Sequence, residues 1–245
     1  MNYKLTLQYD GSRYDGWQKQ GNTDNTIQGK LEGVLSQLAG QPVEVHGAGR
    51  TDAGVHALGQ VASVRLPGER PAEEVMDYLN RYLPEDIAVV DARQAGDRFH
   101  ARLNAVGKVY RYDLRLGTVP DVFRRKYQYR LEGALDLNAM ERAAALLTGT
   151  HDFRSFCSNR RYKKSTVRTV RSIDISRRGN NVSLTFRGDG FLYHMVRILT
   201  GTLLEVGQGR RAPEEMSAVL AALDRSAAGP TAPAQGLTLV EVEYC

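Results

Sequence analysis

The order in which strand-like and helix-like segments follow one another constrains the fold of this chain more than any single residue. Within the first 95 residues, short alternating or apolar stretches predict four strands, at 2–10, 42–49, 58–66 and 87–94. Apolar residues at helical spacing predict two helices between them, at 26–40 and 70–84. The order is β-α-β-β-α-β, in which Gly40 ends the first helix and Val75, Leu79 and Tyr82 line one face of the second.

The same order recurs in the rest of the chain. Strands are predicted at 106–116, 126–131 and 236–245, and a hairpin with a Gly-Asn-Asn turn at 168–188. Helices are predicted at 135–149, 191–207 and 212–225. The fold class is therefore α+β, with two tandem ferredoxin-like β-α-β-β-α-β domains at 1–100 and 106–245. The join falls near 96–106, and a small-residue loop at 227–236 precedes the last strand.

Composition is typical of a water-soluble globular protein. The 245 residues are 42% hydrophobic and 25% charged, and no apolar run is long enough to span a membrane. The N-terminus lacks the basic head and apolar stretch of a signal peptide. Two cysteines, Cys157 and Cys245, do not make a disulfide framework, so we expect a reduced, cytoplasmic setting.

Positive charge is concentrated in the second half of the chain. The net charge is +5. Residues 160–171 hold six Lys or Arg and no acid, and 123–130 hold four more. Such runs are typical of proteins that bind a polyanion, and they predict contact with nucleic acid. The alternative is a basic face that is merely solvated.

The segment GAGRTDAGVHA, residues 47–57, places one carboxylate, Asp52, among small residues. Asp52 is either a turn residue followed by the permissive Gly54, or an ionised acid that acts as nucleophile or base. Arg50 favours the charged form of such an acid. A general acid–base pair needs a second carboxylate, which the segment lacks.

Metal and cofactor motifs are missing from the sequence. His46 and His56 lie near Asp52, but the HExxH, CxxC and EF-hand spacings do not occur. GAGRTD is not a Walker loop, and GQGRRA at 207–212 follows an apolar helix rather than a strand. We expect no metal and no cofactor.

Two further segments carry candidate binding residues. In KVYRY, residues 108–112, Tyr110 and Tyr112 share one face of a strand, where they either stack on bases or simply pack. The apolar helix FLYHMVRIL, residues 191–199, carries His194 and Arg197. A guanidinium there needs an anionic partner, for which Asp52 is a candidate.

Five ordered motifs resemble the tRNA pseudouridine synthase A family and together cover nearly the whole chain. They are YDGSRYDGWQKQ, GRTDAGVHA, FHARLNAVGKVYRY, GFLYHMVRILTG and GLTLVEVEY. The resemblance implies two ferredoxin-like domains whose sheets join around a basic central cleft. It also implies a homodimer that holds the tRNA anticodon stem-loop and isomerises uridine to pseudouridine at nucleotides 38 to 40.

The resemblance also implies roles for individual residues. Asp52 matches the family's catalytic aspartate, and Tyr110 matches its base-stacking tyrosine. Arg50 and Arg197 match active-site arginines, and Leu237 matches a leucine that lines the pocket. The isomerisation oxidises nothing and consumes no water, which agrees with the missing cofactor motifs.

The basic run supplies candidate contacts to tRNA phosphates: Arg160, Arg161, Lys163, Lys164 and Arg168. Two other functions compete with the isomerase. One is a non-catalytic module that binds RNA by its shape. The other is a hydrolase or lyase of a small phosphorylated substrate, with Asp52 as base.

Overall fold

The computed structural model describes residues 1–21, 23–159, 161 and 163–245. The chain clusters into two compact units. Unit 1 comprises Met1–Val106 and Thr238–Cys245, and unit 2 comprises Gly107–Leu237. The division predicted from the sequence keeps the C-terminal strand with the second half, whereas this strand clusters with unit 1. Both units contain helices and strands, so the chain is a mixed α and β protein.

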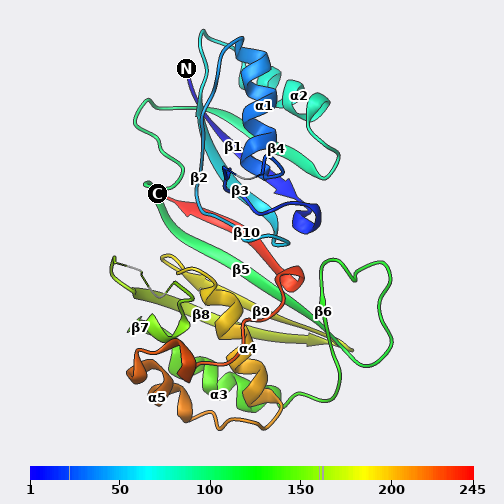
Figure 1. The fold of residues 1–245 in the computed structure, drawn as a ribbon, viewed down its shortest axis with the longest axis vertical. Helices are drawn as coiled ribbons and strands as arrows, with labels where there is room; N and C mark the ends of the chain where they lie inside the picture. Colours follow the sequence, from blue (N-terminus) through cyan, green and yellow to red (C-terminus); the bar gives the residue numbers. More distant parts are fainter. Residues whose placement is uncertain (22, 160, 162) are drawn as a thin grey trace. The chain divides into compact units, whose positions relative to one another are not determined.

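Unit 1 follows the predicted element order (Figure 1). Its elements are β1 (Asn2–Tyr9), the 3₁₀ turn η1 (Gly11–Arg13), α1 (Ile27–Ala39), β2 (Val45–Gly47), β3 (His56–Arg65), α2 (Ala72–Tyr82), β4 (Ile87–Ala95) and, from the C-terminus, β10 (Leu237–Tyr244).

The strands of unit 1 are centred on β1 and β3. Strand β1 is antiparallel to β4 on one side and to β3 on the other. The opposite edge of β3 is shared: β2 pairs antiparallel with its end, and β10 pairs parallel with its beginning, where Thr238 lies opposite His56. The start of β3 immediately follows the segment that carries Asp52, so β10 holds the strand next to the candidate site.

Helix α1 ends at Gly40, as its sequence predicts. The Thr26 hydroxyl accepts from the Gly29 N–H at the start of α1, and Gly40 takes the left-handed conformation, φ 68°, at its end. In α2, Val75 and Leu79 are buried as predicted. Tyr82 is not on that buried face: it is 54% exposed and its ring lies against Tyr78. Tyr82 is the last residue of α2, where the chain turns into extended backbone.

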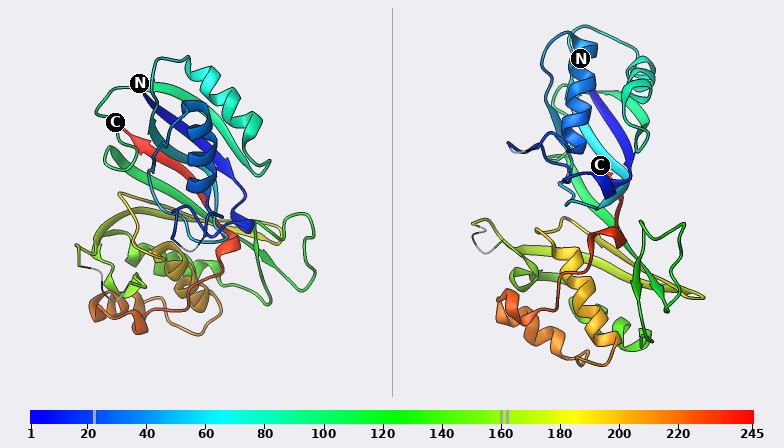
Figure 2. Two further views of the ribbon diagram at one scale, coloured as in Figure 1. Left: turned by 45° about the horizontal axis from the view of Figure 1, so that its top comes forward. Right: turned by 45° about the vertical axis from the view of Figure 1, so that its right-hand side comes forward.

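Unit 2 also contains strands and helices. Its elements are β5 (Ala105–Leu116), β6 (Tyr129–Leu131), α3 (Leu137–Leu147), β7 (Gly149–Asp152), η2 (Arg154–Phe156), β8 (Val167–Arg178), β9 (Asn181–Gly188), α4 (Met195–Gly207), α5 (Glu215–Ala222), η3 (Arg225–Ala227) and η4 (Ala234–Gly236). The strand order is β5-β9-β8-β7 with antiparallel neighbours, and β6 pairs parallel with β5. Helices α3, α4 and α5 lie on one face of these strands in all three views (Figures 1 and 2).

The structure corrects the start of the long apolar helix. The helix predicted at 191–207 begins only at Met195, because His194 takes a left-handed conformation, φ 62°, that breaks the helix. Strand β7 was not predicted from the sequence. The β8–β9 hairpin is present, with its turn at Gly179, φ 58°.

The loop before the last strand packs tightly on α4. A Cβ at Gly201 would lie 1.8 Å from the Pro230 carbonyl oxygen, so only glycine allows this approach. The Gly229 N–H donates to the Thr202 hydroxyl. The helix thereby fixes the path of 228–236 toward Leu237. Among the described residues, none of the helices has the length and hydropathy needed to cross a membrane.

Candidate functional site

The segment that carries Asp52 is held by buried aromatic packing. Trp17, which is fully buried, lies so close to Gly47 that a Cβ there would come within 2.4 Å of its ring. The Ala48 N–H donates to the Val61 carbonyl at 2.7 Å, which ties the segment to β3. The small residues before Asp52 thus admit a flat ring of the protein itself.

Thr51 anchors the segment directly before Asp52. Its hydroxyl is 2.8 Å from the Tyr9 hydroxyl, and its carbonyl accepts from the Trp17 N–H at 3.0 Å. The Gln60 amide donates to the Gly49 carbonyl at 2.9 Å. Burial raises the pKa of Tyr9 to about 12, while its hydrogen bonds to Thr51 and Gln60 act in the opposite direction. Tyr9 therefore stays neutral at physiological pH.

Asp52 has the turn position that one of the two sequence alternatives predicts. Its backbone carbonyl accepts from the Val55 N–H at 3.1 Å, and Gly54 has φ 79°, so Asp52 begins a turn. Its side chain is half-buried, whereas Arg50 is exposed. A carboxylate on a turn that is anchored on both sides has a fixed position, which suits a group that must meet a reacting atom.

The two histidines near Asp52 have other neighbours. The Nδ1 of His56 accepts from the Gly11 N–H at 3.1 Å and lies 3.3 Å from an Asp10 oxygen. His46 stacks on His100, with ring centroids 4.9 Å apart. Within the described part of the chain, no three His, Cys, Asp or Glu side chains are arranged to hold a metal ion.

In unit 2, Tyr110 is buried on β5 and packs on the turn between β9 and α4. It is 7% exposed, and its ring meets Phe191 edge to face at 5.4 Å. Tyr112 is fully buried beside Gly236, and its hydroxyl donates to the Pro233 carbonyl at 2.8 Å. Tyr112 therefore has a packing role, and Tyr110 reaches the turn.

Arg197 is half-buried in the first turn of α4. Its Nε donates to the Ala232 carbonyl at 2.8 Å, and its own carbonyl accepts from the Ala232 N–H. Burial raises the pKa of Tyr112 above its ordinary value, and the charge of nearby Arg197 acts in the opposite direction. Leu237, at the end of the same loop, is buried. The predicted pairing of Asp52 with Arg197 joins residues of different units and stays a prediction.

The basic run lies between β7 and β8 and extends into β8. Arg161, Lys163 and Lys164 are exposed. Arg168 is half-buried and donates to the Ser165 and Val167 carbonyls. Arg160 lies outside the described residues.

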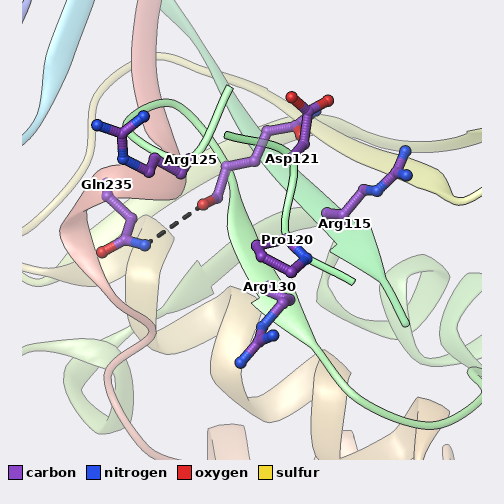
Figure 3. Close-up of a pocket in the computed structure, with 7 residues that line it drawn as sticks. Arg115, Pro120, Asp121, Arg125, Arg130 and Gln235 are labelled. Carbon is purple, nitrogen blue, oxygen red and sulfur yellow. Dashed lines mark hydrogen bonds between the residues drawn. The ribbon is translucent and has the colours of Figure 1, made fainter. Parts of the chain in front are cut away.

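A cavity of about 300 Å³ lies apart from all these residues, within unit 2 (Figure 3). It is lined by Arg115, Pro120, Asp121, Arg125, Gln128, Arg130 and Gln235. Gln235 donates to the Gln128 carbonyl, and Arg115 lies opposite Arg130 in the pairing of β5 with β6. The lining carries three guanidinium groups, which point in different directions, and one carboxylate, and none of the residues predicted for the reaction lines the cavity (Figure 3).

Sequence reasoning assigned no role to several residues that build the site. Trp17 and Tyr9 occur in the motif YDGSRYDGWQKQ, but their packing on 47–51 is a long-range contact that spacing does not reveal. Phe191 was assigned to helix, whereas it precedes α4 and packs on Tyr110. The signal that could have pointed to Trp17 and Tyr9 was the motif YDGSRYDGWQKQ itself, which has no periodic pattern of its own.

Comparison with known proteins gives a match over most of the chain. A family profile described as tRNA pseudouridine synthase matches residues 6–104 and 143–245. The tRNA pseudouridine synthase A of Bacillus sp. (strain KSM-64) is 48% identical over 243 residues, 99% of each chain. That of Moorella thermoacetica is 48% identical over 242 residues, and that of Brevibacillus brevis is 45% identical over 241, each covering 98% of both chains.

Proposed function

The chain belongs to the tRNA pseudouridine synthase family, and we propose that it acts at nucleotides 38 to 40 of the anticodon stem-loop with Asp52 as nucleophile. The reaction is an isomerisation of uridine in tRNA. It breaks the C–N glycosidic bond, turns the uracil and forms a C–C bond, so atoms and electrons balance without an external reagent. What the reaction requires of the protein is an ionised nucleophile and a held base.

The rigid presentation of Asp52 is the observation that carries this proposal. Asp52 follows Thr51, which is hydrogen-bonded to Tyr9 and Trp17. Asp52 also begins a turn that is closed by the hydrogen bond from the Val55 N–H to its carbonyl. Asp52 is half-buried. An anchored nucleophile loses little freedom when substrate binds, which lowers the barrier to attack.

The other residues supply binding and charge. Tyr110 stacks on the base once it has left the helical stack, which offsets part of an unstacking cost of a few kcal/mol. Arg197 stabilises the ionised Asp52 in the closed site, and Arg50 holds the displaced base or a flanking phosphate. Leu237 supplies an apolar wall beside the base. These roles rest on the motif matches together with the burial of Tyr110 and Leu237.

The arrangement of the whole enzyme extends the proposal. The strand order β4-β1-β3-β2 in unit 1 supports a ferredoxin-like domain, and β5-β9-β8 in unit 2 supports a second one. We infer a cytoplasmic homodimer with a basic cleft, in which Arg160, Arg161, Lys163, Lys164 and Arg168 contact phosphates of the anticodon stem-loop.

Replacing Asp52 by its amide tests the chemistry. We expect the Asp52→Asn protein to bind tRNA normally but to release no tritium from tRNA labelled at uridine C5, because the amide cannot attack. Asp77→Asn, an exposed residue of α2, is the matched control and should keep full activity. Tritium release by Asp52→Asn at the control rate would remove Asp52 from the mechanism. No release by the unaltered enzyme would leave the RNA-binding module as the function.

Mapping of pseudouridines in tRNA tests the position. We expect cells that lack the gene to lose pseudouridine at nucleotides 38 to 40 and to regain it from a plasmid that carries the wild-type gene. Regain from the Asp52→Asn gene, or loss at other nucleotides only, would contradict the proposal.

A further inference from the structure

Two aromatic rings stack on each other just before α4, outside the residues assigned above; Tyr193 is exposed and His194 is half-buried. Tyr193 is 53% exposed, and its ring stacks on His194 with centroids 3.8 Å apart and planes 27° from parallel. Tyr193 is therefore the solvent-exposed member of a stacked pair at the end of the turn between β9 and α4. Flat aromatic faces are the surfaces on which proteins stack nucleobases.

The pair is held in place rather than free to rotate. The Nδ1 of His194 lies 3.0 Å from the Ser158 hydroxyl, and the Ser158 N–H donates to the Tyr193 carbonyl at 3.2 Å. His194 has φ 62°, a conformation that costs a non-glycine residue energy and that persists only where its surroundings impose it. The stacked rings are therefore pre-positioned, and Ser158 links them to the start of the basic run.

The neighbours of the pair are those expected beside an RNA strand. Phe191, two residues earlier, packs on Tyr110, and Arg197, three residues after His194, occupies the first turn of α4. The Arg168 side chain passes 3.8 Å from the position of a Cβ at Gly190. A base-stacking tyrosine, two arginines and the stacked ring pair thus adjoin one short turn.

We propose that Tyr193 and His194 form a stacking platform for an unpaired nucleotide of the anticodon loop next to the target uridine. This inference rests on the proposed function. Tyr110 receives the uridine, and the platform receives its neighbour, so that the strand stays ordered when the uridine leaves the stack. Stacking is tolerant of base identity, which suits an enzyme that acts on several adjacent positions.

A fluorescent base tests the contact directly. We use anticodon stem-loop RNA with 2-aminopurine on the 5′ or the 3′ side of the target uridine, because stacking on an aromatic ring quenches its emission. The wild-type protein should quench one of the two probes. Tyr193→Ala should lose that quenching and raise the Kd by roughly 5- to 150-fold, the range that one stacked base provides. Tyr193→Phe keeps the ring and should restore both.

Tyr82→Ala is the matched control, because Tyr82 is equally exposed but lies on α2 of unit 1. It should leave quenching, Kd and tritium release unchanged. Equal quenching by the wild-type protein and Tyr193→Ala, at either probe position, would overturn the platform. A Tyr193→Ala protein that differs from the wild type in melting temperature alone, with unchanged quenching and Kd, would overturn it as well. Quenching that depends on Tyr193 without tritium release from any RNA would support the platform and reject the proposed function.

Discussion

At the scale of single residues, Arg197 is the side chain for which a predicted role in the reaction can be distinguished most cleanly from a role in tRNA binding. Its Nε is already bonded to the Ala232 carbonyl, which aims the rest of the guanidinium. We expect Arg197→Met to lower kcat by at least 100-fold, because the ionised nucleophile loses a stabilising charge worth roughly 3 kcal/mol in a closed site. The Kd for tRNA should change less than threefold.

Single-turnover kinetics and filter binding measure the two quantities for Arg197→Met. Because Arg197 also joins α4 to 228–236, the melting temperature of the variant is recorded alongside. Equal losses of kcat and affinity would mean that Arg197 holds the RNA and does not serve the reaction.

The buried Tyr9 makes the stability of unit 1 sensitive to alkaline pH. An unfolded tyrosine ionises near pH 10, whereas burial holds Tyr9 neutral up to about pH 12. Its contribution is therefore complete below pH 10 and is lost as pH rises toward 12, with a total of about 2–3 kcal/mol. Urea unfolding of the wild-type protein should show this decline, and Tyr9→Phe should reduce it.

The control for Tyr9→Phe is Tyr82→Phe, which removes a hydroxyl from an exposed ring. Its alkaline decline should equal that of the wild-type protein. Part of the decline persists in both variants, because burial also raises the pKa of Tyr14, Tyr112 and Tyr244. A slope unaltered by Tyr9→Phe would show that Tyr9 ionises without opening the segment at 47–51.

The role of a residue could be predicted where the signal lay in its immediate sequence neighbours, and not where it lay in residues far away along the chain. Asp52 and Gly54 could be interpreted from their immediate neighbours, and the turn they form is present. The ring of Trp17 against Gly47 joins positions thirty residues apart, and no periodicity predicts such a contact. Physical reasoning left Tyr110 as either a stacking or a packing residue and offered Asp52 as a partner for Arg197, and the motif resemblance then implied a single role for each.

At the scale of elements, the C-terminal end of α5 has backbone strain that a substitution can remove. Leu223 takes a left-handed conformation, φ 51°, at the C-cap, and half of its side chain is exposed. Glycine adopts this conformation without steric cost, so Leu223→Gly should stabilise the fold by about 0.5–1 kcal/mol. Gly40→Ala at the end of α1, where φ is 68°, should destabilise it by about 1 kcal/mol.

Denaturant midpoints measured at one pH test this pair of substitutions. Glycine generally lowers stability through the entropy of the unfolded chain, which predicts the opposite sign for both variants, so the two expected results together identify the left-handed backbone conformation as the cause. If Leu223→Gly is less stable than the wild-type protein, the apolar contacts of Leu223 outweigh its backbone strain.

Element boundaries were predictable where a capping residue marks them and not elsewhere. Thr26 and Gly40 delimit α1 as their types suggest. The apolar run from Phe191 continues the pattern of α4, so only the backbone of His194 reveals that the helix starts later. Strand β7, Gly149–Asp152, is short and polar, so its sequence gives no strand pattern. Its pairing with β8 identifies it as a strand.

At the scale of the whole molecule, the sequence predicts two repeats, and the last strand, β10, follows the second along the chain. An alternating segment such as LTLVEVEY fits the end of the second repeat by order alone. It clusters instead with unit 1, where Thr238 and Leu239 pair with the start of β3. The alternating pattern of this segment predicts a strand. Its place in the sheet is set by pairing with the edge of β3.

The basic run gives the whole molecule a measurable electrostatic signature. Each phosphate that a lysine or arginine neutralises releases condensed counterions, so the logarithm of the binding constant falls linearly with the logarithm of salt concentration. Lys163 and Lys164 are both exposed. We expect Lys163→Glu with Lys164→Glu to weaken tRNA binding most at low salt and to reduce the slope by roughly 1.4–1.8, about 0.7–0.9 for each of the two lost contacts.

The matched control for this pair reverses two exposed cations of unit 1, Arg81→Glu with Arg93→Glu, and changes the net charge by the same amount. If tRNA responds only to the total charge of the protein, both double variants bind equally weakly and their salt slopes coincide. If the basic run tracks the phosphates, only the lysine variant has the shallower slope. A lysine variant whose affinity and slope match those of the wild-type protein would move the RNA path to another face of unit 2.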